Sequence, residues 1–132
     1  MVYLFRYKYN YRYFILFFYS LILFLSVPAL GKELTKEQKI GELSFQLVNA
    51  IDMFQTLEIV EHSDLYYETN PILGKHPKNY EVVGYFIARG FLHYEVTKWL
   101  PSKFRLPWLT ITVLPQIPII EHNHNLGIRI AW

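Results

Sequence analysis

The sequence predicts a small, mainly α-helical protein, in which a bundle or hairpin of about three helices follows an N-terminal signal or anchor helix. Two observations support this fold class. The chain of 132 residues is 52% hydrophobic and 18% aromatic, which is too apolar for disorder and suits one small domain. After residue 31, apolar residues recur at helical spacing in three segments. A short C-terminal tail is predicted to be irregular or β-like.

Composition also excludes several function classes. The net charge is +2 and the basic residues are spread along the chain, so we expect no nucleic-acid partner. The chain has no cysteine, which excludes disulfides, thiolate zinc sites and cysteine nucleophiles. It also contains no Gly-rich phosphate loop, nucleophile elbow or His-Glu-x-x-His helix. We therefore expect no cofactor.

The N-terminal residues 1–31 have the pattern of a signal peptide. An apolar run at 14–27 is preceded by a cationic flank and followed by small residues up to Gly31; the flank carries Arg6, Lys8 and Arg12. Cleavage after Gly31 leaves a single helical, membrane-associated domain at 32–132. The alternative is an uncleaved anchor, because residues 13–31 are uncharged and a bilayer crossing needs about 20 residues. In either case the chain that follows is exported.

A first helix is expected from about residue 35 to 62, with Thr35 as its N-cap. Its polar residues share one sector: Glu42, Gln46, Asn49, Asp52 and Thr56. The opposite side carries Ile40, Leu43, Leu47, Ile51, Phe54 and Leu57. The simplest interpretation is a helix on a membrane or on a soluble core with its polar face in water. The alternative is a bundle helix whose Asp52 faces a partner inside, as an intramembrane carboxylate requires.

A second helix is expected at about 80–100, ended by Pro101. Arg89 and His93 are four residues apart and therefore lie one above the other. In a bundle, Arg89 is the natural counter-ion for Asp52 or Glu68, because an unpaired charge in low dielectric is costly. The simpler interpretation is that Arg89 extends to an interface and that His93 is a hydrogen-bonded packing residue.

The third segment, 106–120, is uncharged but contains Pro107, Pro115 and Pro118, so we expect a re-entrant or kinked helix, or else a short strand at 110–114. The tail at 126–132 alternates like an edge strand. Just before it, Glu121, His122 and His124 are candidate ligands for zinc or a similar ion, although two histidines two residues apart converge only on a strand. The same stretch equally fits a polar tail near a membrane surface.

Between the first two helices lies the group Glu68, Thr69, Asn70 and Pro71. Pro71 keeps Asn70 extended, which leaves the Asn70 amide group free to bond the neighbouring backbone. We expect a structural cap and corner here, with a ligand or ion site as the alternative.

Three features together carry a resemblance: the Asp52-x-x-Gln55-Thr56 spacing, the Glu-Thr-Asn-Pro-Ile-Leu-Gly run from Glu68 to Gly74, and His93. In these features the chain resembles a group of small uncharacterised exported membrane proteins of proteobacteria and their phages, and more distantly a broad domain-of-unknown-function family. The resemblance covers roughly residues 37–127 and implies a helical membrane protein. We expect it in the bacterial inner membrane with an exported portion, or alternatively in the periplasm. It implies no activity, and Pro115 and Pro118 depart from the smoother third helix of the group.

We therefore expect a small exported membrane protein that acts by interaction in the cell envelope, with other envelope proteins or with copies of itself. A buried polar network is expected to hold it together; its members are Asp52, Gln55, Thr56, Glu68, Asn70, Arg89 and His93. One alternative is a metal-binding or proton-handling protein or enzyme that uses Asp52, Glu68 and His93. The other is a soluble periplasmic helical module.

Overall fold

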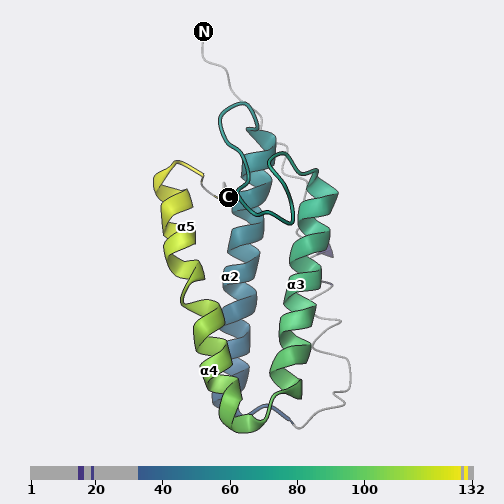
Figure 1. Cartoon of the computed structure of the whole chain (residues 1–132), viewed down its shortest axis with the longest axis vertical. Coiled ribbons are helices and arrows are strands. Elements are labelled where there is room, and N and C mark those ends of the chain that lie inside the picture. The colour runs from purple at the N-terminus through teal and green to yellow at the C-terminus, as the bar shows by residue number, and fades with distance from the viewer. Residues whose placement is uncertain (1–14, 17–18, 20–32, 129, 131–132) are drawn as a thin grey trace.

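A computed structural model of the chain describes residues 15–16, 19, 33–128 and 130. Its main helices are α2 (Lys36–Glu61), α3 (Asn79–Trp99), α4 (Ser102–Val113) and α5 (Gln116–Asn125). Figure 1 shows α2 at the centre, α3 antiparallel to it on one side, and α4 and α5 stacked end to end on the other. The predicted mainly helical bundle is confirmed. The predicted signal or anchor segment lies outside the described residues, apart from the exposed Ile15, Leu16 and Tyr19.

Helix α2 begins with a capping box, as the sequence of its first turn favours. The Thr35 hydroxyl accepts a hydrogen bond from the Gln38 backbone N–H at 3.3 Å, and the Gln38 side chain accepts one from the Thr35 N–H at 3.2 Å. The helix ends at His62, whose N–H donates to the Glu58 carbonyl. The predicted bounds of this helix are confirmed to within one residue.

The corner between α2 and α3 is closed by its own side chains. Glu68 Oε1 accepts hydrogen bonds from the backbone N–H groups of Thr69 and Asn70, at 2.8 and 2.7 Å. Asn70 Oδ1 in turn accepts from the N–H of Ile72 at 3.0 Å. Gly74 follows with a φ of 74°, a left-handed conformation that glycine adopts without strain. The predicted structural corner is confirmed.

Helix α3 ends where Pro101 requires an extended residue before it, and Leu100 supplies that residue. The carbonyls left free there are bound by Arg105, a buried residue of α4. Its Nε donates to the Leu100 carbonyl at 2.9 Å and its Nη2 to the Lys98 carbonyl at 2.7 Å. A buried guanidinium is thus satisfied by the C-terminal end of a helix, where the helix dipole also favours a cation.

The third predicted segment differs from the structure in its bounds. Helix begins at Ser102, breaks at Leu114 and Pro115, and continues to Asn125, so the strand considered at 110–114 is wrong. Pro115 caps α5 and Pro118 is its third residue, where a backbone N–H has no intrahelical partner in any case. The Gln116 side chain donates to the Thr112 carbonyl at 2.6 Å across the break.

The predicted β-like tail is not confirmed. Leu126 and Gly127 form a turn, and Gly127 has a φ of 91°. Ile128 is buried, and its N–H donates to the Asn123 carbonyl at 3.0 Å. Residues 33–128 contain no strand; residues 129, 131 and 132 lie outside the described part of the chain.

The polar sector of α2 faces inward, so the interpretation that placed it in water is wrong. Glu42 is 4% exposed and Asn49 is fully buried, whereas Leu43 and Leu47 on the opposite side are more than half exposed. The physical reason is that α3 and α4 bring hydrogen-bond partners to this sector, which removes the cost of burying it. None of the helices in the described part is both long enough and apolar enough to cross a membrane.

A compact apolar cluster fills the bundle towards the α2–α3 corner, where Met53 of α2 packs with Val82, Val83 and Phe86 of α3. Next to it, Gly90 lets the two helices approach closely: a Cβ there would lie 2.7 Å from Gln46 Oε1. The close contact allows Asn49 Nδ2 to donate to the Phe86 carbonyl at 3.0 Å. Side chains of α2 thus bond directly to the α3 backbone.

Candidate functional site

The most completely bonded polar group of the interior is the Glu42 carboxylate. Gln46 Nε2 donates to Glu42 Oε1 at 2.8 Å, and the Thr97 hydroxyl lies 2.9 Å from Oε2. His93 Nδ1 lies 3.0 Å from Oε2 and 3.1 Å from Oε1. Because an ionised carboxylate only accepts hydrogen bonds, Nδ1 is the protonated nitrogen in this contact. Three donors on two helices therefore fix one buried carboxylate.

The His93 ring is held on its faces as well as at its edges. It stacks on Phe45 of α2, with ring centroids 3.4 Å apart and an interplanar angle of 3°. On the other side lies Trp108 of α4, at 5.2 Å. The second ring nitrogen, Nε2, lies 2.8 Å from the Thr112 hydroxyl, also on α4. His93 is thus the hydrogen-bonded packing residue that the simpler interpretation expects.

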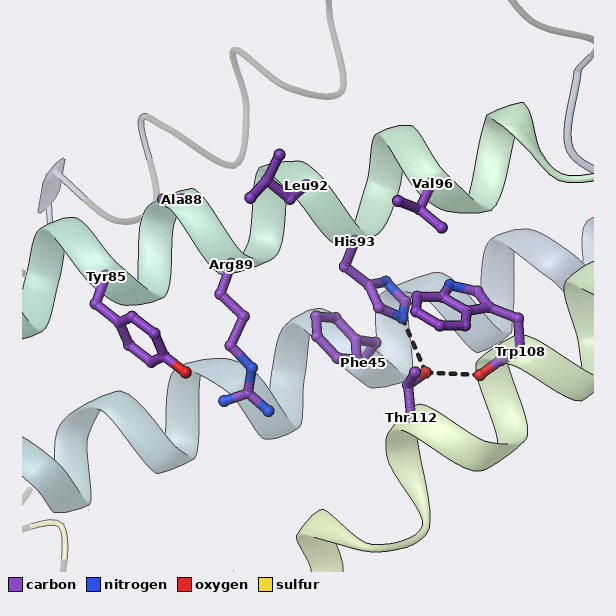
Figure 2. A pocket seen from close by; sticks show the side chains of 9 residues that line it. All are labelled: Phe45, Tyr85, Ala88, Arg89, Leu92, His93, Val96, Trp108 and Thr112. Atoms are coloured by element: carbon purple, nitrogen blue, oxygen red, sulfur yellow. Dashed lines mark hydrogen bonds between the residues drawn. The ribbon is translucent and has the colours of Figure 1, made fainter. Parts of the chain in front are cut away.

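Glu42, His93 and Thr112 form a line of carboxylate, imidazole and hydroxyl across α2, α3 and α4. The line ends at a groove of about 440 Å³ between α3 and α4. Figure 2 shows the groove lined by Phe45, Tyr85, Ala88, Arg89, Leu92, His93, Val96, Trp108 and Thr112, with His93 bonded to Thr112. Most of these side chains are apolar, so the hydroxyl and the imidazole lie beside a space suited to an apolar chain.

Asp52 and Arg89 form the expected ion pair, with Arg89 Nη1 donating to Asp52 Oδ2 at 3.0 Å. Both side chains are partly exposed, at 20% for Asp52 and 26% for Arg89. The guanidinium also lies over the Phe45 and Phe86 rings, 5.6 and 5.7 Å from their centroids. Arg89 is therefore the counter-ion of Asp52 and does not extend to an interface.

The structure separates the remaining predicted network residues into groups. Glu68 acts on Asp52 by charge repulsion, but its hydrogen bonds go to the corner backbone together with those of Asn70. Gln55 Nε2 donates to the Ile120 carbonyl at 3.1 Å, and Gln55 Oε1 accepts from Asn123 at 3.2 Å, so this residue ties α2 to α5. The next residue of the predicted network, Thr56, is also buried.

His93 bonds to Glu42 and Thr112 rather than to Asp52 or Glu68. Asp52, Glu68 and His93, which the metal-binding or proton-handling alternative requires together, therefore do not form one site.

The candidate metal ligands Glu121, His122 and His124 lie on α5 rather than on a strand. Positions two apart on a helix point to different sides, so the His-x-His spacing does not converge. Within the described ranges, no group of three or more His, Asp or Glu side chains could hold a metal ion.

Sequence reasoning placed Glu42 in the polar sector of α2 but did not single it out, and it missed Thr97, Trp108 and Thr112. A signal for them exists in the spacing. Glu42 and Gln46, His93 and Thr97, and Trp108 and Thr112 are each four residues apart, which places each pair on one helix face. The spacing does not show that these faces of α2, α3 and α4 pack against one another.

Comparison with known protein families, with curated proteins and with solved structures finds no match to this chain.

Proposed function

We propose that the protein is a small exported membrane protein whose helix bundle lies in the lipid bilayer and acts by interaction within the cell envelope. The observation that carries the proposal is the distribution of side chains. Among the described residues, thirteen buried side chains are polar or charged and nine are hydrophobic. This is the reverse of a water-soluble domain, in which the interior is chiefly apolar.

The outer surface supports the same conclusion. Large apolar side chains are exposed on each of the four main helices: Ile40, Leu43 and Leu47 on α2, Leu92 and Val96 on α3, Leu106 and Ile111 on α4, and Ile117 and Ile119 on α5. Such extensive apolar exposure is unusual for a water-soluble monomer. The bundle as a unit presents a surface that lipid chains would solvate, while the polar side chains bond to one another inside.

The ends of α3 fit the dimensions of a bilayer. Its 21 residues span roughly 30 Å at 1.5 Å per residue, which is the hydrocarbon thickness, although α3 is not apolar enough to cross by itself and would depend on its neighbours in the bundle. Tyr80 at one end is 63% exposed and Trp99 at the other is 84% exposed. Tyrosine and tryptophan at such positions suit the two headgroup layers. The resemblance to small exported membrane proteins points the same way.

Membrane extraction tests the proposal. Cells that produce the tagged protein are fractionated, and the membranes are washed with alkaline carbonate and then with an alkyl maltoside detergent. We expect the protein to stay in the carbonate pellet and to dissolve only in detergent. Release by carbonate, or recovery as a monodisperse species without detergent, would favour the soluble periplasmic module instead.

Export is tested separately. Leu16→Arg places a charge in the apolar run of the N-terminal segment, which should block its insertion. With a periplasmic reporter fused after residue 132, we expect a loss of reporter activity in this variant and normal activity in the conservative Leu16→Ile. An unchanged Leu16→Arg signal would show that the N-terminal segment does not direct export.

A further inference from the structure

Thr112 lies at the end of a series of contacts that runs from the buried Glu42 carboxylate through His93. We propose that Thr112 is a nucleophile activated by His93, and that it accepts long-chain acyl groups from esters bound in the groove between α3 and α4. This inference is independent of the interaction role proposed above, because it depends only on the geometry of the groove.

The geometry is that of a hydroxyl, a base and an orienting acid. Thr112 Oγ1 lies 2.8 Å from His93 Nε2, and His93 Nδ1 lies 3.0 Å from Glu42 Oε2. In hydroxyl nucleophiles of this kind, the imidazole takes the proton and the carboxylate fixes the tautomer and stabilises the imidazolium. Glu42 is itself fixed by Gln46, and the His93 ring is clamped between Phe45 and Trp108. The base is therefore held in one orientation before any substrate binds.

The reaction step balances without any further reagent. Thr112 Oγ1 forms a bond to the ester carbonyl carbon while its proton passes to His93 Nε2. The carbon–oxygen bond to the leaving alcohol then breaks, and the alcohol takes the proton from His93. Water repeats the sequence on the acyl-threonine, which releases a carboxylic acid and restores the hydroxyl. The Glu42 carboxylate accepts the hydrogen bond from His93 Nδ1 and so keeps the ring oriented through both steps.

The groove selects the substrate class. Leu92, Val96 and Phe45 give it apolar walls, and Leu92 is 60% exposed, so the groove is open at its side. Its volume falls within the usual range of small-molecule pockets, about 300–1,000 Å³. Arg89 is the one lysine or arginine among the lining residues, and its guanidinium is paired with Asp52, so most of the groove wall stays apolar. A long acyl chain beside its ester group matches this combination.

The same helix offers a matched control. Thr110 and Thr112 each lie within hydrogen-bond distance of the carbonyl four residues earlier in α4, that of Leu106 at 2.9 Å and that of Trp108 at 2.8 Å. A hydroxyl carries one proton, and Thr112 can turn its proton from that carbonyl to His93 Nε2. Thr110 is exposed, and no imidazole contact is found for it in the described part of the chain. Any reactivity that comes from a helical threonine alone should therefore appear equally at both residues.

The test uses the full-length protein in alkyl maltoside micelles with p-nitrophenyl esters of four-carbon and twelve-carbon acids. Nitrophenolate release is followed by absorbance, and the acyl adduct is mapped by peptide mass spectrometry after an acid quench. We expect the adduct on Thr112, faster release with the longer chain, and unchanged behaviour in Thr110→Val. Thr112→Ser keeps a hydroxyl beside His93 and should still form the adduct at position 112. Thr112→Val and His93→Gln should each lower the release rate by at least about 100-fold.

Folding is checked by circular dichroism, because His93→Gln removes a buried contact whereas Thr112→Val keeps the side-chain volume. Three outcomes would overturn the inference: no adduct on the folded wild-type protein, an adduct confined to other residues, or equal release by wild type and a folded Thr112→Val.

Discussion

At the scale of single residues, the interior depends most on Glu42. Replacing it by alanine leaves Gln46, His93 and Thr97 without the acceptor that they share. Breaking a buried, hydrogen-bonded pair of this kind typically costs about 3–5 kcal/mol. We expect Glu42→Ala to lower the free energy of unfolding by that amount, measured by chemical denaturation in detergent with circular dichroism.

Glu37→Ala is the control for this change, since Glu37 is an exposed residue in the first turn of the same helix. Hydrogen bonds to the backbone and to Thr35 lower the pKa of Glu37, but its carboxylate remains in water. We expect little effect on unfolding. A loss of stability in Glu37→Ala equal to that in Glu42→Ala would indicate a general effect on α2 rather than loss of the buried centre.

Asp52 and Asn70 test the two other parts of the predicted network. Asp52→Ala leaves the partly exposed Arg89 guanidinium without its carboxylate, and a charged hydrogen bond of this kind contributes about 1.5–3 kcal/mol, less where water reaches the pair. Asn70→Ala removes one exposed hydrogen bond to the Ile72 N–H, worth about 0.5–1.5 kcal/mol. We expect both variants to accumulate less folded protein in membranes by immunoblot, with the larger loss in Asp52→Ala. Wild-type levels of both would place these residues outside the stabilising network.

At the scale of the helices, glycine positions decide how closely α2 and α3 pack. A Cβ at Gly90 would lie 2.7 Å from Gln46 Oε1 and 3.3 Å from Asn49 Nδ2. Gln46 cannot move without losing its bonds to Glu42 and to the Gly90 carbonyl. We expect Gly90→Ala to lower the free energy of unfolding by about 1–3 kcal/mol, despite the better helix propensity of alanine.

Gly84→Ala in the same helix provides the matched comparison. A Cβ at Gly84 meets no atom within 4 Å, so only the propensity gain of up to about 1 kcal/mol applies. We expect this variant to be as stable as the wild type or more so, by thermal unfolding in detergent. The close approach of α2 and α3 would be disproved if both alanine variants were equally stable.

The helices themselves could be predicted where the chain carries local signals. Thr35 with Gln38 defines the start of α2, and Pro101 defines the end of α3. The break between α4 and α5 at Pro115 could not be located in this way. A proline can kink one continuous helix or stand at the start of a new one, and the sequence of 106–120 is compatible with both. The hypothesis of a bundle paired Arg89 with Asp52 or Glu68, since an unpaired charge there is costly, and the structure selects Asp52.

The Glu42 centre could not be predicted in the same way. Its members come from three helices, and their contacts depend on the rotation of each helix about its axis. The polar sector of α2 was visible in the spacing, but whether it faced water or other helices depended on partners far away in sequence. His93 pairs with Glu42, 51 residues earlier, although Asp52 is nearer along the chain.

At the scale of the whole molecule, a charge on the outer face of α2 should have different effects on a water-soluble protein and on a protein in a bilayer. Leu47 is 56% exposed near the middle of the helix, and its neighbour Gln46 is buried. On a water-soluble protein, Leu47→Arg would change stability by no more than about 0.5 kcal/mol and would favour solubility. In a bilayer, an arginine at the centre of a helix costs about 2.5–3.5 kcal/mol.

We therefore expect Leu47→Arg to reduce the amount of protein inserted in membranes severalfold, measured by immunoblot of the carbonate-washed pellet, while Leu47→Ile leaves it unchanged. Gln46→Leu makes the inward face more apolar, yet it should also lower accumulation, because Glu42 and the Gly90 carbonyl lose a shared donor. Leu47→Arg and Gln46→Leu together distinguish an outer surface that faces lipid from one that faces water. If Leu47→Arg accumulated normally while Gln46→Leu did not, the buried polar centre would stand but the outer surface of the bundle would have to face water.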